Sequence, residues 1–137
     1  MNWTLEVVVV PVADVDRAKE FYVDKLGFDA DHDTKVGDAV RIVQLTPPGS
    51  GCSVVISKGI VSMQPGSLEG LQLVVNDLHQ ARKELVERGV DVSEIEVYAE
   101  TGPRPEQPGD DLNNAGFIHF ADPDGNRWAV QQITARP

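Results

Sequence analysis

The hydrophobic pattern of the chain occurs twice, in the same order and at a constant spacing. An apolar run at 7–13 leads into Asp14 and then into apolar residues at helical spacing, and a similar run leads into Asp77. The offset is constant, since 77 − 14 and 81 − 18 (Ala81 and Ala18) both give 63. Each copy has an apolar side that must be covered, so two modules are expected to pack together around a shared cleft.

The first copy predicts a strand followed by a helix. Leu5–Val10 is a continuous, mostly β-branched run, which is typical of a strand buried on both faces. Asp14 is placed as an N-cap, because its carboxylate can accept hydrogen bonds from the first helical turn. Gly27 follows as a left-handed C-cap. The helix should bury one stripe, which consists of Val15, Ala18, Tyr22 and Leu26, with Phe21 beside it. In the second copy, Asp77 and Gly89 take the two capping positions.

Three strand-like segments follow each helix, so each half reads β-α-β-β-β and the fold class is α+β. We predict a first module at 1–59, a linker at 60–66 and a second module at 67–137. The segment Glu100–Ala115 has no periodicity and three prolines, so it is either a lid over the cleft or an exposed tip. The predicted strands after the helices are Phe28–Lys35, Ala39–Leu45, Cys52–Ser57, Val92–Tyr98, Phe117–Ala121 and Arg127–Gln132.

Composition excludes several classes of protein. Twelve Lys and Arg against 22 Asp and Glu give a net charge of −10, which is unsuited to neutralising phosphates of a nucleic acid. Cys52 is the single cysteine, so an intramolecular disulfide and a thiolate metal cage are excluded. No apolar stretch approaches roughly 18 residues and the first residues lack a basic segment, so we expect no membrane span, no signal peptide and a cytoplasmic protein.

Two motifs resemble those of a known superfamily. Pro11-Val-Ala-Asp14, with Phe21-Tyr22 and Leu26-Gly27-Phe28 after it, is similar to the opening of vicinal oxygen chelate proteins. Phe120-Ala-Asp-Pro-Asp-Gly-Asn126 is similar to their closing signature. That superfamily includes glyoxalase I, extradiol dioxygenases and bleomycin-type resistance proteins. The resemblance implies paired βαβββ modules whose sheets curl into a cup, commonly in a homodimer; it leaves the activity open.

The resemblance also implies where metal-dependent members place their ligands. The matching positions are Val7, Gly70 and Ala129, with a fourth near Val54. None of the first three carries a donor atom, and a one-residue slip that recruited Glu6 or Glu69 would turn the side chain to the other face of a strand. We therefore predict no metal, no cofactor and no catalytic residue. His32 and His79 are expected at the surface, whereas His119 could face the cup.

Strand alternation predicts the wall of the cup. If Val7, Gly70 and Ala129 face inward, their alternate neighbours do so as well, which gives a small, apolar wall with two amides and one guanidinium. The two amides could instead satisfy one another. Trp3 is a candidate for the rim or for a dimer seam and Tyr98 for closing over a ligand, while Trp128 should lie in the core. The predicted ligand-binding residues are Trp3, Leu5, Val7, Val9, Gly70, Gln72, Val74, Tyr98, His119, Arg127, Ala129 and Gln131.

Such a wall suits a large, flat ligand that is held by apolar contact and oriented by a few hydrogen bonds. The sequence therefore favours a metal-free, homodimeric protein that sequesters a bulky aromatic or polycyclic antibiotic or natural product. An uncharged or anionic polycycle, of the anthraquinone or enediyne type, suits Arg127 best. The alternative is a lyase, isomerase or dioxygenase-type enzyme on the same fold, metal-dependent or not, in which His119 or a glutamate acts as base and Arg127 holds an anion. A regulatory protein without a specific ligand is the third possibility.

Overall fold

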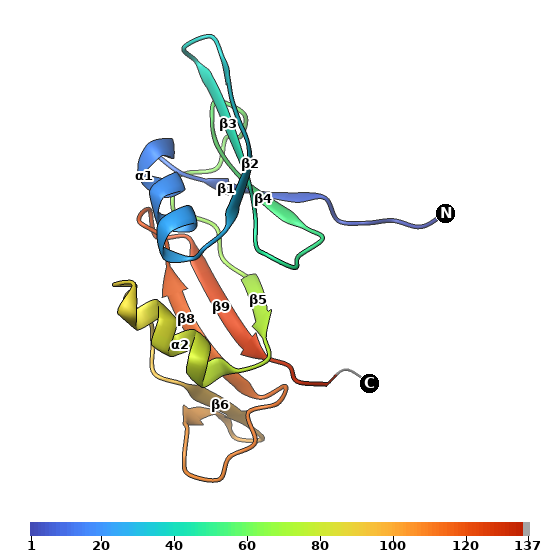
Figure 1. The fold of residues 1–137 in the computed structure, drawn as a ribbon, viewed down its shortest axis with the longest axis vertical. Coiled ribbons are helices and arrows are strands. Elements are labelled where there is room, and N and C mark those ends of the chain that lie inside the picture. The colour runs from blue at the N-terminus through green and yellow to red at the C-terminus, as the bar shows by residue number, and fades with distance from the viewer. Residues whose placement is uncertain (136–137) are drawn as a thin grey trace. The chain divides into compact units, whose positions relative to one another are not determined.

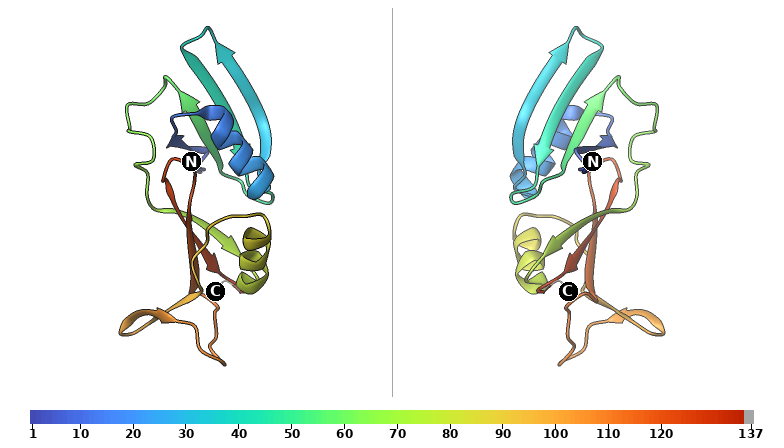
Figure 2. Two further views of the ribbon diagram at one scale, coloured as in Figure 1. Left: turned by 90° about the vertical axis from the view of Figure 1, so that its left-hand side faces the viewer. Right: turned by 90° about the vertical axis from the view of Figure 1, so that its right-hand side faces the viewer.

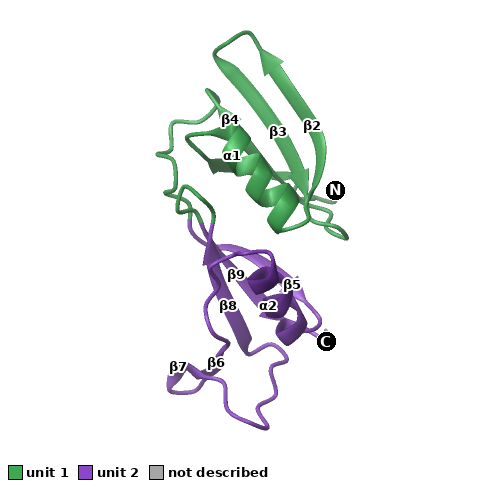
Figure 3. Cartoon of the chain, turned by 60° about the vertical axis from the view of Figure 1, so that its left-hand side comes forward, with its two compact units in different colours: residues 1–68, 122–126 green, residues 69–121, 127–137 purple. Residues whose placement is uncertain are grey.

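The structure is a computed structural model that describes residues 1–135, and it divides into two compact units. The first unit comprises residues 1–68 and 122–126, and the second comprises 69–121 together with the residues from 127 onward (Figure 3). The turn at 122–126 thus packs with the first unit although it joins two strands of the second. The module boundaries predicted from the sequence stay a prediction.

The first unit is a four-stranded sheet with one helix against it (Figure 1). The strand order is β1-β4-β3-β2, and β1 and β4 are parallel while the other pairs are antiparallel. The helix continues from α1 into a π-helical turn, η1, and ends at Gly27, whose φ of 76° is left-handed as predicted. The elements are β1 (Val7–Pro11), α1 (Val15–Glu20), η1 (Phe21–Lys25), β2 (Asp29–Val36), β3 (Val40–Thr46) and β4 (Ser53–Lys58).

The second unit repeats this plan with one additional strand. Its sheet has the order β5-β9-β8-β6-β7, with β5 and β9 parallel, and α2 lies against one face (Figure 2). The two βαβββ-type modules confirm the predicted α+β class. The elements are β5 (Leu71–Val75), α2 (Leu78–Glu87), β6 (Glu96–Ala99), β7 (Gly102–Pro105), β8 (Gly116–Ala121) and β9 (Arg127–Gln132).

Each helix begins where its capping aspartate was predicted. Asp14 Oδ1 accepts from the amide of Arg17 at 3.1 Å, and Asp77 Oδ1 accepts from the amide of Gln80 at 3.0 Å. In the first unit most of the helix stripe is buried, with Ala18 and Tyr22 fully inaccessible and Leu26 half-buried. Fully burying one large apolar side chain stabilises a fold by about 1.5–3 kcal/mol, so this stripe holds the helix on its sheet.

A charge cluster also joins α1 to its sheet. Asp33 on β2 accepts from Lys19 at 2.9 Å and from the guanidinium of Arg41, which also pairs with Asp16. The hydrogen bond from Arg41, followed by that from Lys19, holds the pKa of Asp33 well below its usual range.

Three details of the sequence prediction were wrong. The first strand begins at Val7, and Leu5 lies before it, 68% exposed. The strand expected at 92–98 is the shorter β6, because residues 92–95 are not paired in the sheet. The segment 100–115 contains β7, which forms a hairpin with β6.

Candidate functional site

The second sheet has one face against α2 and another that points away from it. Ile118, Phe120 and Trp128 alternate toward α2 and are buried, as predicted for Trp128. The strand registers then place the intervening residues together on the other face, since Gln72 and His119 both pair with Ala129. We call this the open face of the second sheet. Its further members are Val74, Phe117 and Gln131.

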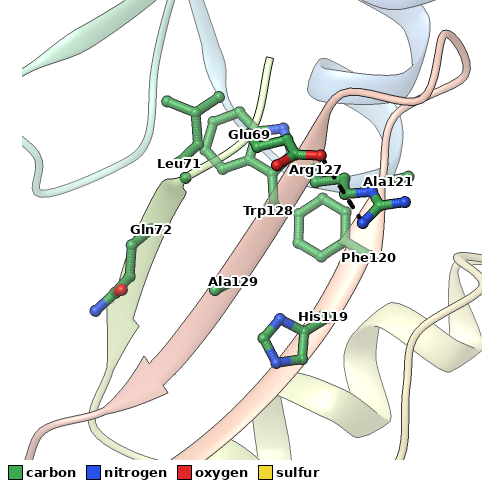
Figure 4. Close-up of a pocket in the computed structure, with 10 residues that line it drawn as sticks. Glu69, Leu71, Gln72, His119, Phe120, Ala121, Arg127, Trp128 and Ala129 are labelled. Carbon is green, nitrogen blue, oxygen red and sulfur yellow. Dashed lines mark ion pairs between the residues drawn. The ribbon is translucent and has the colours of Figure 1, made fainter. Parts of the chain in front are cut away.

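A hollow of about 460 Å³ lies at the end of this sheet where β5 and β9 begin (Figure 4). Five of the residues predicted to bind a ligand line this hollow, and they bring a guanidinium, an imidazole and an amide to one place. Gly70 and Ala129 leave space because they carry little or no side chain. The predicted residues in the lining are Gly70, Gln72, His119, Arg127 and Ala129; the others are Glu69, Leu71, Phe120, Ala121 and Trp128.

Glu69 lies where strand alternation did not predict it. It was expected to point away from the cup, yet it lines the hollow, and its carboxylate lies 3.9 Å from Arg127 (Figure 4). The strand count failed here because β5 begins only at Leu71, and Gly70 has a φ of 91°. A left-handed residue interrupts the alternation of an extended chain, so the side chain before it leaves the expected face.

The two glutamines on the open face are engaged with one another. Gln72 donates to Gln131 Oε1 at 2.6 Å, and Gln131 donates to the carbonyl of Asn114 at 2.8 Å. Of the two interpretations that the sequence left open, mutual satisfaction describes Gln131. Within residues 1–135, Gln72 Oε1 has no hydrogen-bond partner, so one amide acceptor remains at the hollow.

Three rings form a row along the open face. Tyr98 on β6 stacks on Phe117 with ring centroids 4.6 Å apart, and Phe117 is nearly parallel to His119 at 6.4 Å. His119 is the end of the row that lines the hollow. We call Tyr98, Phe117 and His119 the aromatic row; its rings offer polarisable surface continuous with the hollow.

The segment after β7 is fixed by hydrogen bonds. Arg104 and Asp110 form two parallel hydrogen bonds of 2.8 Å, and the amide of Gln107 donates to the same carboxylate. The hydrogen bond from Arg104, followed by that of the backbone amide, lowers the pKa of Asp110 to about 2. Asn114 continues the segment toward the sheet, because its carbonyl receives Gln131.

The remaining predicted site residues lie elsewhere. Trp3, Leu5, Val7 and Val9 belong to the first unit, whereas every residue that lines the hollow belongs to the second. Trp3 is 87% exposed. Val74 and Gln131 share the open face with the hollow but do not line it.

The histidines follow the sequence analysis. His79 is exposed and lies 2.8 Å from Glu106, and His32 is exposed on β2, while His119 faces the hollow.

The side chains at the metal-ligand positions do not fit a divalent cation. Val7, Gly70 and Ala129 provide no oxygen or nitrogen donor, and neither does Val54; the one donor beside it is the hydroxyl of Ser53, which is hydrogen-bonded to Thr46 at 2.6 Å. Across residues 1–135, no group of three or more His, Cys, Asp or Glu is gathered closely enough to hold a metal.

The chain belongs to the glyoxalase/bleomycin resistance protein/dioxygenase superfamily, which residues 4–130 match. It is similar to TnmS3, an antibiotic binding protein from Streptomyces sp. CB03234, with 32% identity, a TM-score of 0.74, and 96% of this chain and 97% of that chain covered. A glyoxalase/bleomycin resistance protein from the same organism is 33% identical, with a TM-score of 0.71 and coverage of 94% and 100%. A superfamily member from Sphaerobacter thermophilus DSM 20745 is 26% identical, with a TM-score of 0.74 and coverage of 96% and 98%. No curated protein matches the chain significantly.

No helix in the described part of the chain is long and apolar enough to cross a membrane.

Proposed function

We propose that this protein binds a bulky, flat aromatic or polycyclic antibiotic or natural product. It confers protection by sequestering that compound, and it does so without a metal and without changing the compound chemically. The observation that carries the proposal is the hollow of the second sheet, where a floor of Gly70 and Ala129 meets the aromatic row. The family membership and the similarity to an antibiotic binding protein support the same conclusion.

The size and lining of the hollow suit such a ligand. Its volume of about 460 Å³ falls within the range of roughly 300–1,000 Å³ that is usual for small-molecule sites. Leu71, Ala121 and Ala129 supply accessible apolar surface, since Phe120 and Trp128 turn toward α2 and are buried. A flat ligand loses little conformational entropy when it packs against such a wall. Gln72 and His119 can orient the ligand by hydrogen bonds, because polar groups in a mostly apolar site determine the pose.

The aromatic row extends this surface beyond the hollow. Tyr98 is half exposed, and its stacking on Phe117 leaves its outer ring face available to a ligand. An offset-stacked aromatic pair contributes about 0.5–1.5 kcal/mol beyond the area that it buries. A polycycle seated on Ala129 could therefore continue along the row, whereas a small aliphatic substrate would leave the row unused.

We further propose that the protein acts as a cytoplasmic homodimer, and that Trp3, Leu5, Val7 and Val9 contribute to binding there. Trp3 and Leu5 are large apolar side chains left in water by a single copy, which supports their burial in an assembly. Sedimentation of the purified protein tests this part: a monomer at micromolar concentration would contradict it.

Tryptophan fluorescence tests the proposed function directly. The chain has two tryptophans, and Trp128 lines the hollow, so the Trp3→Phe variant makes Trp128 the sole reporter. We expect saturable quenching of Trp128 by an uncharged anthraquinone. Ala129→Phe should weaken binding at least about tenfold, since it fills the floor of the hollow. Ala30→Phe, an exposed position on β2 of the first unit, is the matched control and should bind like the parent.

The enzymatic alternative is favoured by one observation. His119 lines the hollow, and neither of its ring nitrogens has a hydrogen-bond partner among residues 1–135, so the imidazole is available as a base. Chromatography and mass spectrometry of the ligand after release separate the two functions. Recovery of intact anthraquinone supports sequestration. A product whose formation is lost in His119→Gln would establish catalysis, and absence of quenching would refute the binding function altogether.

A further inference from the structure

The two charged side chains at the hollow have opposite signs and lie at the same end of it. Arg127 is the first residue of β9, and Glu69 precedes the glycine that leads into β5. Their charged groups approach to 3.9 Å, on the rim that Figure 4 shows above His119 and Ala129. We call Glu69 and Arg127 the rim pair.

The backbone explains why the pair forms. β5 and β9 are parallel neighbours, and Leu71 pairs with Trp128. Gly70 and Arg127, the residues just before these two, therefore lie side by side. The left-handed Gly70, with a φ of 91°, redirects the chain and brings Glu69 over the hollow. Apart from Gly70 itself and its chain neighbours, no residue has an atom within 4 Å of the position of a Cβ on Gly70, so the space beside the rim pair is open to a ligand.

The rim pair does little for stability. The two side chains are 75% and 72% exposed, and solvent screens exposed pairs so strongly that they contribute little to folding. The rim pair matters more to a ligand in the hollow, because the ligand approaches both charges at short range. For such a ligand, the carboxylate of Glu69 offsets the field of the Arg127 guanidinium.

We propose that the rim pair sets the charge selectivity of the site, and that Glu69 turns a hollow containing Arg127 into one selective for uncharged polycycles. This rests on the proposed binding function and narrows its ligand class. An anionic ligand would meet Glu69, a cationic ligand would meet Arg127, and an uncharged ligand with hydroxyl or carbonyl groups would meet a donor and an acceptor. The net charge of −10 further disfavours anions at long range.

The expected size of the effect follows from Coulomb's law. One unit charge about 5 Å from another in water changes a dissociation constant by about fourfold, and partial burial of the ligand raises this to about tenfold. Removing one member of the rim pair should therefore shift binding of a charged probe by about four- to tenfold. The shift should have opposite signs for a cation and an anion, while an uncharged probe should stay within about twofold.

Three probes with one aromatic core measure this selectivity. They are anthraquinones that carry a hydroxymethyl, a sulfonatomethyl or a trimethylammoniomethyl group at carbon 2, and each is titrated by Trp128 quenching in the Trp3→Phe background. Glu69→Gln should tighten binding of the sulfonate and weaken binding of the ammonium compound. Arg127→Gln should do the reverse.

Matched controls separate the rim pair from overall charge. Glu87→Gln and Lys83→Gln change the net charge by the same amounts, but both positions lie on α2, against the opposite face of the sheet. Neither should shift any probe by more than about twofold at physiological salt.

Three results would overturn the inference. If Glu69→Gln and Glu87→Gln shift the charged probes equally, the selectivity arises from net charge and the rim pair has no role. If the hydroxymethyl compound binds and neither rim variant discriminates between the charged probes, the inference fails while the binding function stands. If no probe binds to the unsubstituted rim, the proposed function is refuted and this inference with it.

Discussion

Tyr22 is buried in the first unit and donates a hydrogen bond of 2.7 Å to Oδ2 of Asp122, which lies 100 positions later in the sequence. The same carboxylate receives the side chain of Asn126 at 2.8 Å on that oxygen. Its Oδ1 receives the backbone amides of residues 124, 125 and 126 at 2.9–3.0 Å. The closing turn of the chain is therefore organised around one buried acceptor, which ties it to the first helix.

Replacing Tyr22 with Phe removes this hydrogen bond and leaves the packing of the ring in place. A hydrogen bond to a charged group contributes about 1.5–3 kcal/mol. Asp122 retains four of its five donors in the variant, so it is not left unsatisfied and the lower end of that range applies. We expect Tyr22→Phe to lower the free energy of unfolding by about 1.5 kcal/mol.

Urea unfolding followed by far-ultraviolet circular dichroism measures this change, and Tyr98→Phe is a matched control. The chain has two tyrosines, and Tyr98 is half exposed, so its substitution should stay within about 0.5 kcal/mol of the parent. A Tyr22→Phe variant as stable as the Tyr98→Phe variant would show that the tie between the helix and the closing turn contributes nothing, which would refute the argument.

Three further outcomes follow from local geometry. Gly70→Ala should cost about 1–2 kcal/mol for its positive φ alone, whereas Gly66→Ala should cost about 3 kcal/mol or more in urea unfolding, because its Cβ would lie 2.0 Å from the carbonyl oxygen of Asp124. The carboxyl carbon of Asp110 should titrate by NMR near pH 2, and Arg104→Gln should return it toward 3.8. Because that folded-state pKa is depressed, the ion pair of Arg104 and Asp110 contributes fully above pH 4, and its contribution is lost as the pH falls toward 2. A titration midpoint near 4 in the parent would contradict this expectation. Asp77→Ala should destabilise by about 1 kcal/mol, since it removes the cap of α2, and an unchanged urea midpoint would show the cap to be unimportant.

The repeat in the sequence was sufficient to predict the two modules. Both capping aspartates and the left-handed Gly27 lie where the pattern placed them, because a cap depends on residues within one turn of the chain. Local periodicity also assigned Trp128 to the buried side of β9, and it left open that His119 faces the cup; the structure places His119 at the hollow. Period-two alternation holds over these strands because they stay extended.

The same rule failed where the backbone leaves the extended region. Glu69 lies over the hollow because of the positive φ at Gly70, and no count along a strand includes such a change of direction. The strand β7 was missed because two of its four residues are prolines, which seldom occur within a sheet; here it is the edge strand.

What the sequence determined by itself was both helices with their caps and most of the strands, because these elements are decided by neighbours a few positions apart. What only the tertiary structure decided was which groups meet: Tyr22 with Asp122, Gln72 with Gln131, and Glu69 with Arg127. These pairs are separated by 58 to 100 positions, as 127 − 69 and 122 − 22 show. Their meeting depends on strand register and on the path of the turns, and both are properties of the packed chain.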